Sequence, residues 1–258
     1  MTTATATLPD PRTPWLTRIP ARYEPVAVCL PHAGLGASAF SSWPVGIGGA
    51  RVLPVQPPGH ESRFRERCPV SVDEFAEGLA RALRGLRPRP LLFVGHCGAV
   101  PYALETARLL RESGTPATQM RLLASSWGAP HRDIYGPLNQ RPLHLIDTVA
   151  EVTAMMSGRA MPLDPELAEV YGDVLMDDLR AMRGYRFDAS EGLPLSVTVL
   201  GWSDDAVVPR EQAHAGWDQL GAVRLRALTG DHRAFWACGQ PLRELIADEV
   251  RELVGDAH

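Results

Sequence analysis

The chain has 258 residues, a formal net charge of −4 and a hydrophobic content of 45%, a composition typical of a single globular domain with a substantial core. Its basic residues are all arginine and are scattered along the sequence, which argues against a surface for nucleic acid or for an anionic membrane. No segment approaches the roughly 18 apolar residues of a membrane span, and the N-terminus lacks the apolar stretch of a signal peptide. We therefore expect a cytoplasmic protein.

The four cysteines, at positions 29, 68, 97 and 238, show neither a C-x-x-C pair nor the spacing of a zinc site. Reduced thiols that each have a separate role are therefore the expectation. The sequence predicts no metal site and no cofactor.

In chain order, residues 1–22 are rich in Thr, Ala and Pro and are predicted to form an extended segment that contributes little to the core. Apolar runs over 25–31 and 51–59 predict buried strands. The helical spacing of apolar residues over 71–86, with acidic residues in the opening turn, predicts an amphipathic helix.

Strands and helices then alternate up to residue 127, and the alternation resumes after residue 188. This pattern predicts an α/β fold with a mostly parallel central sheet and helices on both faces, built from residues 23–127 and 189–258. Between them, residues 128–188 contain two or three helical segments and no convincing strand. We predict that this part is a helical cap inserted into the core.

The stretch "VGHCGA" places Cys97 at a strand-to-helix corner with Gly95 two residues before it and Ala99 two residues after. This is close to the pattern G-x-nucleophile-x-G, in which small neighbours accommodate a strained turn. The carboxyl end of a parallel strand is also where α/β sheets bind their ligands. We predict that Cys97 is a nucleophile, the alternative being a buried structural cysteine.

A nucleophile of this kind needs a base and an acid that orients the base. "WSDDAVVP" places Asp204 and Asp205 in the loop after one predicted strand, and "TGDHRAFW" places His232 after the next. The order nucleophile, acid, histidine is that of α/β-hydrolases. Asp204 is preferred over Asp205 because it lies three residues after Gly201, the usual offset.

Acyl transfer also requires donors that point at the developing oxyanion. The backbone N–H of Gly98, which follows the nucleophile, is one candidate. The other is the N–H of Ala33 in "LPHAGLGASAF", where small residues let the backbone approach closely.

With these residues in place, the chain resembles the type II thioesterases that accompany polyketide synthases and nonribosomal peptide synthetases. The similarity is spread over about 220 residues and consists of several motifs in order. The similar stretches are "LPHAGLGASAF", "VQPPGHESRF" (family V-Q-x-P-G-R-E-x-R), "RPLLFVGHCGA", "ALETAR", "APHR", "RPLH", "VLMDDLRAMRGYRF" (family L-L-R-A-D-x-R-x-x-E-x-Y-x-Y), "GWSDDAVV" and "TGDHRAFW".

The resemblance implies an α/β-hydrolase fold with Cys97 as nucleophile, Asp204 as acid, His232 as base, and Ala33 and Gly98 as oxyanion donors. It also implies the substrate: an acyl or aminoacyl thioester on the phosphopantetheine arm of an acyl or peptidyl carrier protein. Hydrolysis of this thioester would clear stalled or mis-primed carriers, and no cofactor beyond the carrier's own arm is implied.

The chain departs from the family pattern at Cys97, where the family has serine, and at Gly98 and Ala99, where it has methionine and glycine. Asp231 adds a carboxylate beside His232, where it would raise the pKa of the histidine. A cysteine makes acyl loading reversible, so an acyltransferase that passes the acyl group to another carrier thiol or an amine is an alternative to the hydrolase. A cysteine introduced by mutagenesis and a non-catalytic binding module are further alternatives.

Overall fold

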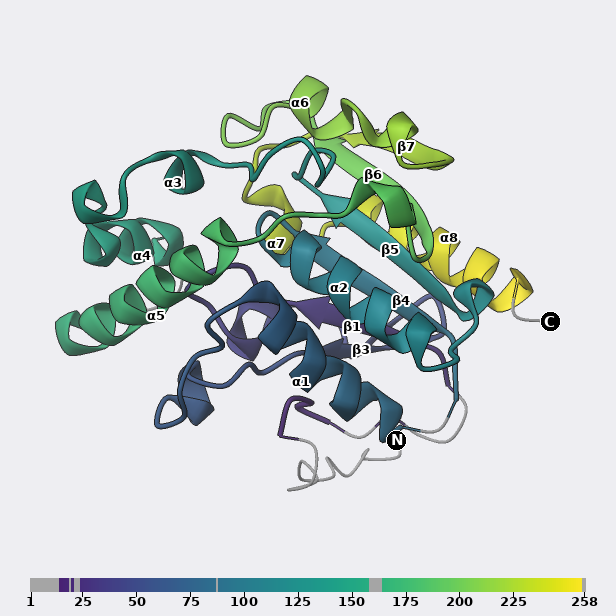
Figure 1. The fold of residues 1–258 in the computed structure, drawn as a ribbon, viewed down its shortest axis with the longest axis horizontal. Helices are drawn as coiled ribbons and strands as arrows, with labels where there is room; N and C mark the ends of the chain where they lie inside the picture. Colours follow the sequence, from purple (N-terminus) through teal and green to yellow (C-terminus); the bar gives the residue numbers. More distant parts are fainter. Residues whose placement is uncertain (1–13, 19, 21–23, 87, 158–163, 257–258) are drawn as a thin grey trace.

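The computed structural model describes residues 14–18, 20, 24–86, 88–157 and 164–256 (Figure 1). A seven-stranded sheet of order β2-β3-β1-β4-β5-β6-β7 forms the centre of the molecule. Its neighbouring strands are parallel except for the antiparallel pair β2 and β3. The strands are β1 (Val26–Leu30), β2 (Gly46–Ile47), β3 (Ala50–Pro54), β4 (Leu91–His96), β5 (Met120–Ser125), β6 (Ser196–Trp202) and β7 (Val223–Leu228).

Helices cover both faces of this sheet, with α1 and α2 on the near face in Figure 1 and α8 on the far face. The mostly parallel α/β architecture predicted from the alternating pattern is confirmed. The helices are α1 (Val72–Arg84), α2 (Ala99–Glu112), α3 (Pro137–Gln140), α4 (Thr148–Met156), α5 (Pro165–Arg183), α6 (Arg210–His214), α7 (Ala234–Ala237) and α8 (Gln240–Asp256). None of these helices is both long and apolar enough to cross a membrane.

Strand β1 shows why its sequence is apolar at every position. Val26, Val28 and Leu30 point into the cluster beneath α1 and α2, whereas Ala27 and Cys29 point into the cluster beneath α8. Successive strand residues face opposite sides of a sheet, so a strand covered on both sides needs a continuous apolar run. This explains why the run over 25–31 predicts a strand correctly.

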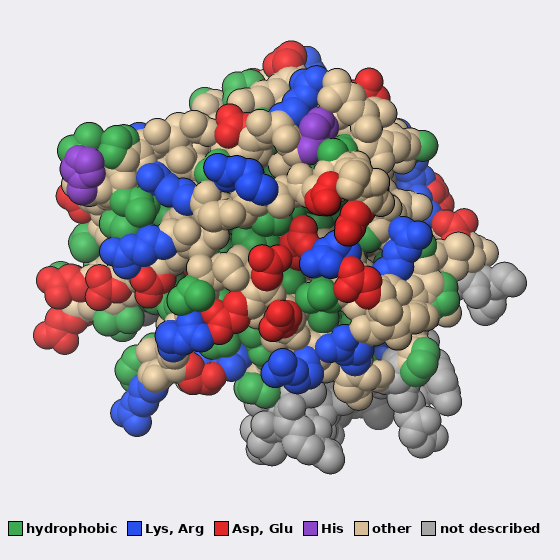
Figure 2. Space-filling model, in the orientation of Figure 1, with side chains coloured by type: hydrophobic (Ala, Val, Ile, Leu, Met, Phe, Trp, Pro, Cys, Tyr) green, Lys and Arg blue, Asp and Glu red, His purple; other side chains and the backbone are tan. Residues whose placement is uncertain are grey.

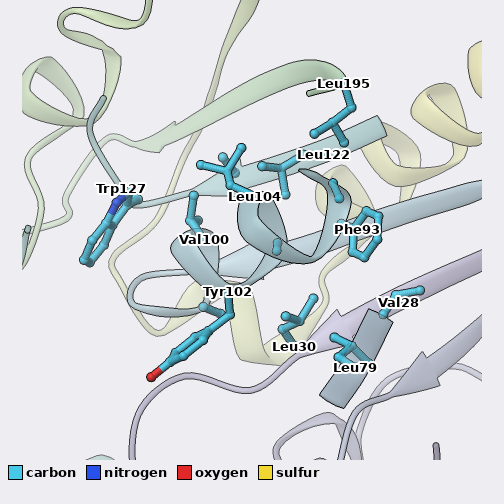
Figure 3. Packing of buried hydrophobic residues seen from close by; sticks show 14 of the residues in the cluster. Val28, Leu30, Leu79, Phe93, Val100, Tyr102, Leu104, Leu122, Trp127 and Leu195 are labelled. Atoms are coloured by element: carbon cyan, nitrogen blue, oxygen red, sulfur yellow. The ribbon is translucent and has the colours of Figure 1, made fainter. Parts of the chain in front are cut away.

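Helix α2 packs directly on the sheet, and Figure 3 shows its side chains interleaved with those of neighbouring elements. Val100 and Leu104 lie among side chains from the central strands, including Phe93 and Leu122, and all four are fully buried. This packing anchors the amino end of α2, which begins two residues after Cys97.

The residues predicted to form a cap, 128–188, contain α3, α4 and α5 and no strand within their described part. In Figure 1 these helices project beyond one end of the sheet. A separate apolar cluster, centred on Ile146, Val152, Leu175 and Leu179, holds them together. Figure 2 shows acidic side chains gathered at the outer end of α5, where Asp164 caps the helix by accepting from the N–H of Glu166.

The prediction for residues 1–22 is wrong in one respect. Most of this segment lies outside the described residues, but Trp15 and Leu16 are buried in the main core. The ring of Trp15 meets that of Phe75 edge to face at 5.0 Å, and Leu16 forms an isolated bridge with Val55. Two large apolar side chains therefore fix residues 15 and 16 against the core.

A buried ion cluster ties α8 to the sheet at the end opposite the carboxyl ends of the strands. The carboxylate of Glu249, which is 2% exposed, accepts from Arg121 at 3.2 Å and from Arg224 at 2.6 Å. Its second oxygen accepts from the hydroxyl of Thr198 at 2.8 Å. A buried carboxylate with this many donors is stabilising only while its partners are present.

We predict that Glu249→Ala lowers the free energy of unfolding by about 3 kcal/mol, because the buried guanidinium of Arg121 loses its only buried counter-charge among the described residues and keeps only the half-exposed carboxylates of Glu252 and Asp256. Urea denaturation followed by circular dichroism measures this loss. The matched control is Asp248→Ala on the same helix, which removes an exposed pair with Arg251 and should change stability by only about 0.5 kcal/mol. Equal losses in the two variants would contradict the prediction.

Candidate active site

The candidate residues lie in loops that follow the carboxyl ends of neighbouring strands. The register places Leu30 of β1 opposite Gly95 of β4, and Gly95 opposite Ala124 of β5, so these parallel strands end at the same edge. The loops that carry Ala33, Cys97, the two aspartates and His232 therefore converge from four separate parts of the chain.

Cys97 occupies a sharp corner between β4 and α2. Its φ of +55° lies in the left-handed region that non-glycine residues rarely adopt, and its backbone N–H donates to the carbonyl of Ser125 at 2.9 Å. A Cβ at Gly95 would lie 3.3 Å from the backbone of Ala99 and Val100. The close approach of α2 thus favours glycine here, as the corner motif predicts.

His232 connects the cysteine to a buried carboxylate. Its Nδ1 lies 3.0 Å from Oδ2 of Asp205, and because a carboxylate only accepts, Nδ1 carries the proton. The other ring nitrogen is left for the hydrogen bond with the Cys97 side chain. Burial alone would lower the pKa of His232, but the hydrogen bonds with Asp205 and Cys97 outweigh burial and raise the pKa to about 10.

The carboxylate of Asp205 is completely buried and fully hydrogen-bonded. Oδ2 accepts from His232 and from the hydroxyl of Ser126 at 2.6 Å, while Oδ1 accepts from the N–H groups of Val207 and Val208 at 2.8 and 2.9 Å. Burial alone would raise the pKa of Asp205, but these hydrogen bonds lower it. The group is therefore a fixed negative charge behind the imidazole.

The preference for Asp204 as the partner of His232 is wrong. Asp204 is exposed, and its side chain accepts from the hydroxyl of Ser203 at 2.8 Å. Its backbone N–H is bound to the carbonyl of Gly230 at 2.9 Å, which continues the pairing beyond β6 and β7 by two residues. The chain turns inward one residue later than the offset from Gly201 suggests, so Asp205 reaches the histidine.

The extra carboxylate of Asp231 also has a different role from the one expected. Its Oδ1 accepts from the backbone N–H groups of Arg233 and Ala234, both at 3.0 Å. It therefore caps the turn into α7. The charge and hydrogen bond that raise the pKa of His232 come from Asp205 and Cys97.

Ala33 and Gly98 line the same cavity as Cys97 and His232. Within the described residues, the backbone N–H groups of Ala33 and Gly98 donate to no other protein group, so both are free to bind an oxyanion. A Cβ at Gly98 would meet only Met182, at 3.8 Å. Local space does not require glycine here, and the structure does not explain this departure from the family pattern.

The cavity has a volume of about 270 Å³ and lies between the sheet edge and the cap. Its base is formed by catalytic candidates, and its opposite wall is mostly apolar. The wall includes Leu138, Met155, Leu175 and Leu179 from the cap, and Trp236 and Arg233 from the core. A larger hollow of about 630 Å³ lined by charged residues such as Arg108 and Glu112 contains none of the candidate catalytic residues.

Two supporting residues were missed by the sequence analysis. Ser126, which has a φ of +52°, donates to Asp205, and no spacing rule points to it. His96 is fully buried, stacks on Phe235 at 4.4 Å and lies 4.3 Å from the ring of His232. Burial lowers the pKa of His96 well below its usual value, so this neutral ring supports His232 by packing.

Comparisons with known proteins identify the family of the chain. The family model of the thioesterase domain matches residues 27–249. The "Probable cadicidin biosynthesis thioesterase" of Streptomyces griseus is 32% identical over 231 residues, which cover 88% of this chain and 63% of the relative; the chain thus spans less than two thirds of that protein.

Solved structures of thioesterases are also similar to this chain. The type II thioesterase BorB from the borrelidin biosynthetic cluster superposes with a TM-score of 0.75 at 27% identity, covering 92% of this chain and 98% of that chain. RedJ, a thioesterase from the prodiginine biosynthetic pathway in Streptomyces coelicolor, gives 0.71 at 29% identity, covering 98% and 91%.

The strand order, the corner after β4 and the histidine after β7 define an α/β-hydrolase. The chain belongs to the thioesterase domain family, and the resemblance to type II thioesterases is confirmed. It is therefore an enzyme of the thioester hydrolase class. Among the described residues, no group of His, Cys, Asp and Glu is arranged to hold a metal ion.

We predict that Asp205→Asn lowers the pKa of His232, because the change removes the charge that outweighs the effect of burial. Titration of the imidazole by NMR should give a pKa near 10 for the unchanged protein and for Asp204→Asn, and a lower pKa for Asp205→Asn. Because the folded pKa lies above the ordinary 6.5, protonated His232 stabilises the fold below about pH 6.5, and this contribution is lost as the pH rises to about 10. A fall caused by Asp204→Asn would contradict the assignment.

Proposed function

We propose that this thioesterase acts on acyl or aminoacyl thioesters carried on the phosphopantetheine arm of a carrier protein, with Cys97 as nucleophile, His232 as proton carrier and Asp205 as the orienting acid. The observation that supports this proposal is the continuous contact from Asp205 through His232 to Cys97 at the base of a cavity. The names of two similar proteins, which refer to cadicidin biosynthesis and to the borrelidin biosynthetic cluster, support the choice of substrate.

In the first step, the sulfur of Cys97 attacks the thioester carbonyl, and the N–H groups of Ala33 and Gly98 stabilise the oxyanion. His232, whose raised pKa favours the protonated ring, takes up the thiol proton of Cys97 as the sulfur attacks. The bond between the acyl carbon and the pantetheine sulfur then breaks, and His232 donates its proton to the leaving sulfur. The acyl group remains on Cys97 as a new thioester.

In the second step, neutral His232 accepts a proton from water as the water oxygen attacks the acyl carbon. The bond to the sulfur of Cys97 breaks, the carboxylic acid leaves, and the cysteine and histidine return to their starting state. Asp205 stabilises the imidazolium that forms in this step, because its carboxylate is held in place by four donors.

The cysteine itself favours a second candidate function. Loading exchanges one thioester for another and is close to thermoneutral, whereas a serine would convert the thioester to a more stable oxyester. The acyl group on Cys97 is therefore reactive toward another carrier thiol or an amine as well as water. Because the thioester on Cys97 and the thioester on the carrier have similar free energies, acyl transfer is the alternative to hydrolysis.

We further propose that residues 128–188 act as a cap over the acyl group. The apolar side chains of Met155, Leu175 and Leu179 line the cavity opposite Cys97, and such a wall suits an acyl chain better than water. The proposed steps use only side chains and water, so we propose no resident cofactor. The described cysteines are all free thiols, which supports a reducing, cytoplasmic location.

Mass spectrometry of the intact protein with an acylated carrier protein tests the proposal. We expect an acyl adduct on Cys97 that is absent from Cys97→Ala, and its rapid conversion to free acid would establish hydrolysis. Persistence of the adduct in water, with transfer to a second holo-carrier, would establish the acyltransferase instead. A protein that no thioester acylates would be a binding module, contrary to the proposal.

Cys97→Ser is expected to change the product distribution. The serine acyl-enzyme is an oxyester, so transfer back to a carrier thiol becomes unfavourable while hydrolysis continues. The ratio of acylated second carrier to free acid, measured by mass spectrometry, should fall about tenfold or more. An unchanged ratio would show that the nucleophile does not decide the acceptor.

Asp205→Asn should reduce kcat by about 100-fold or more, because an amide cannot stabilise the imidazolium and favours the wrong tautomer. Asp204→Asn is the matched control, since it makes the same chemical change at the neighbouring exposed position, and it should change kcat less than about twofold. Steady-state assays with a simple acyl thioester measure both values. Equal, severe losses would indicate that both carboxylates support the histidine.

A further inference from the structure

The loop that carries Ala33 follows β1, and its neighbouring backbone N–H groups are held by side chains from other segments. The N–H of Gly34 donates to Oδ2 of Asp178 at 2.7 Å. Asp178 lies on α5 in the cap, 144 residues away, and is buried. A carboxylate from the cap therefore binds the backbone at the residue directly after the proposed oxyanion donor.

The same oxygen of Asp178 has a second donor. Nε2 of His60 lies 3.0 Å from Oδ2, and Nδ1 of His60 lies 2.9 Å from the carbonyl oxygen of Pro58. Both acceptors lack protons, so both ring nitrogens carry hydrogen and His60 is a buried cation paired with Asp178. Burial alone would lower the pKa of His60, but the charge and hydrogen bond of Asp178 raise it.

The far side of the loop is fixed by the segment that carries His60. Gln56 accepts from the N–H of Ala37 at 3.2 Å and donates to the carbonyl of His60 at 2.8 Å. Glu61 accepts from the N–H groups of Gly36 and Ser38 at 3.2 and 3.1 Å. Four of the five backbone N–H groups over residues 34–38 thus donate to side chains. The N–H of Ala33 donates to no other group among the described residues.

Helix α5 also touches this loop by packing. A Cβ at Gly34 would lie 3.1 Å from Cβ of Leu175, and Gly34 has a φ of +79°. Ala33 itself packs against the apolar cluster of the cap. Leu175 and Asp178 lie three positions apart and therefore on the same face of α5, so one helix face both covers and binds the loop.

We propose that Asp178, held by His60, is a positioning residue that aims the N–H of Ala33 at the oxyanion and couples the cap to the oxyanion hole. The inference rests on the proposed role of Ala33 as an oxyanion donor. It also gives a role to two quoted motifs that the triad does not use: Asp178 matches the aspartate of L-L-R-A-D, and His60 stands where the V-Q-x-P-G-R-E pattern has arginine.

Asp178→Asn is the decisive change because a single oxygen serves both donors. If the amide oxygen of the new asparagine takes the place of Oδ2, the buried His60 cation loses its counter-charge. If the amide nitrogen takes that place, its N–H groups face the N–H of Gly34, and no hydrogen bond can form. The matched control is Asp173→Asn, which makes the same change at an exposed position on α5.

With a simple acyl thioester we expect kcat to fall about 10- to 100-fold in Asp178→Asn, with KM within about threefold of the unchanged protein. This fall approaches the loss of one oxyanion donor, and the transition state is affected more than substrate binding. Asp173→Asn should leave both constants within about twofold. Equal values for the two variants, or a change in KM alone, would overturn the proposal.

Hydrogen exchange of the peptide covering residues 32–38 separates this inference from the proposed function. Asp178→Asn should lose protection there by about tenfold or more while the strands keep theirs, and unchanged protection would overturn the proposal. If protection is lost but kcat is unchanged, Asp178 holds the loop without any effect on catalysis, and the proposal fails. If the unchanged protein has no thioesterase activity while protection responds as expected, the proposed function fails.

If Asp178→Asn does not fold, His60→Gln provides the second variant. Glutamine can donate to Asp178 but carries no charge, so a smaller fall in kcat of about 3- to 10-fold, with partial loss of protection over residues 32–38, is expected. Activity and protection equal to those of the unchanged protein would show that the His60 pair does not position the loop.

Discussion

The buried carboxylate of Asp205 is the interaction on which the candidate site depends. Its four hydrogen bonds come from Ser126, Val207, Val208 and His232, so the charge is stabilised by the fold before any substrate arrives. A buried charge without such partners would protonate or open the loop. Because it is held, it fixes the tautomer of His232 and raises the pKa of that histidine. The side chain of Cys97, the proposed nucleophile, therefore faces a ring whose orientation is already set.

The strained corner at Cys97 is supported from the other side by packing. The positive φ of Cys97 persists because β4 is buried in the middle of the sheet and α2 is anchored by Val100 and Leu104 in the main core. Strain of this kind survives only where the surroundings over-determine the backbone. The same sheet edge receives the loops with Ala33 and His232, so the rigid core sets the distances between groups far apart in sequence.

The cap adds a second source of order. Helix α5 forms one wall of the cavity through Leu175 and Leu179, and it binds the backbone of Gly34 through Asp178. Acyl binding and oxyanion stabilisation are thus assigned to one helix in the proposed mechanism. In the same proposed mechanism, the cysteine at the corner sets the energetics of the acyl-enzyme, and the proposed cap selects the acyl groups that reach it.

Sequence alone was sufficient for the parts of this protein that depend on local pattern: the alternating strands and helices, the glycine-flanked corner at Cys97 and the position of His232 after the last strand. These features follow from periodicity, steric limits and chain order, which neighbouring residues determine. Only the tertiary structure distinguished Asp205 from Asp204 as the partner of His232 and showed that Trp15 lies in the core. It also brought together His60 and Asp178, which are 118 residues apart in the sequence. Each of these outcomes depends on the direction in which the backbone turns in a loop, or on a contact between segments that are far apart in the sequence. The spacing of neighbouring residues determines neither the direction of such a turn nor such a contact.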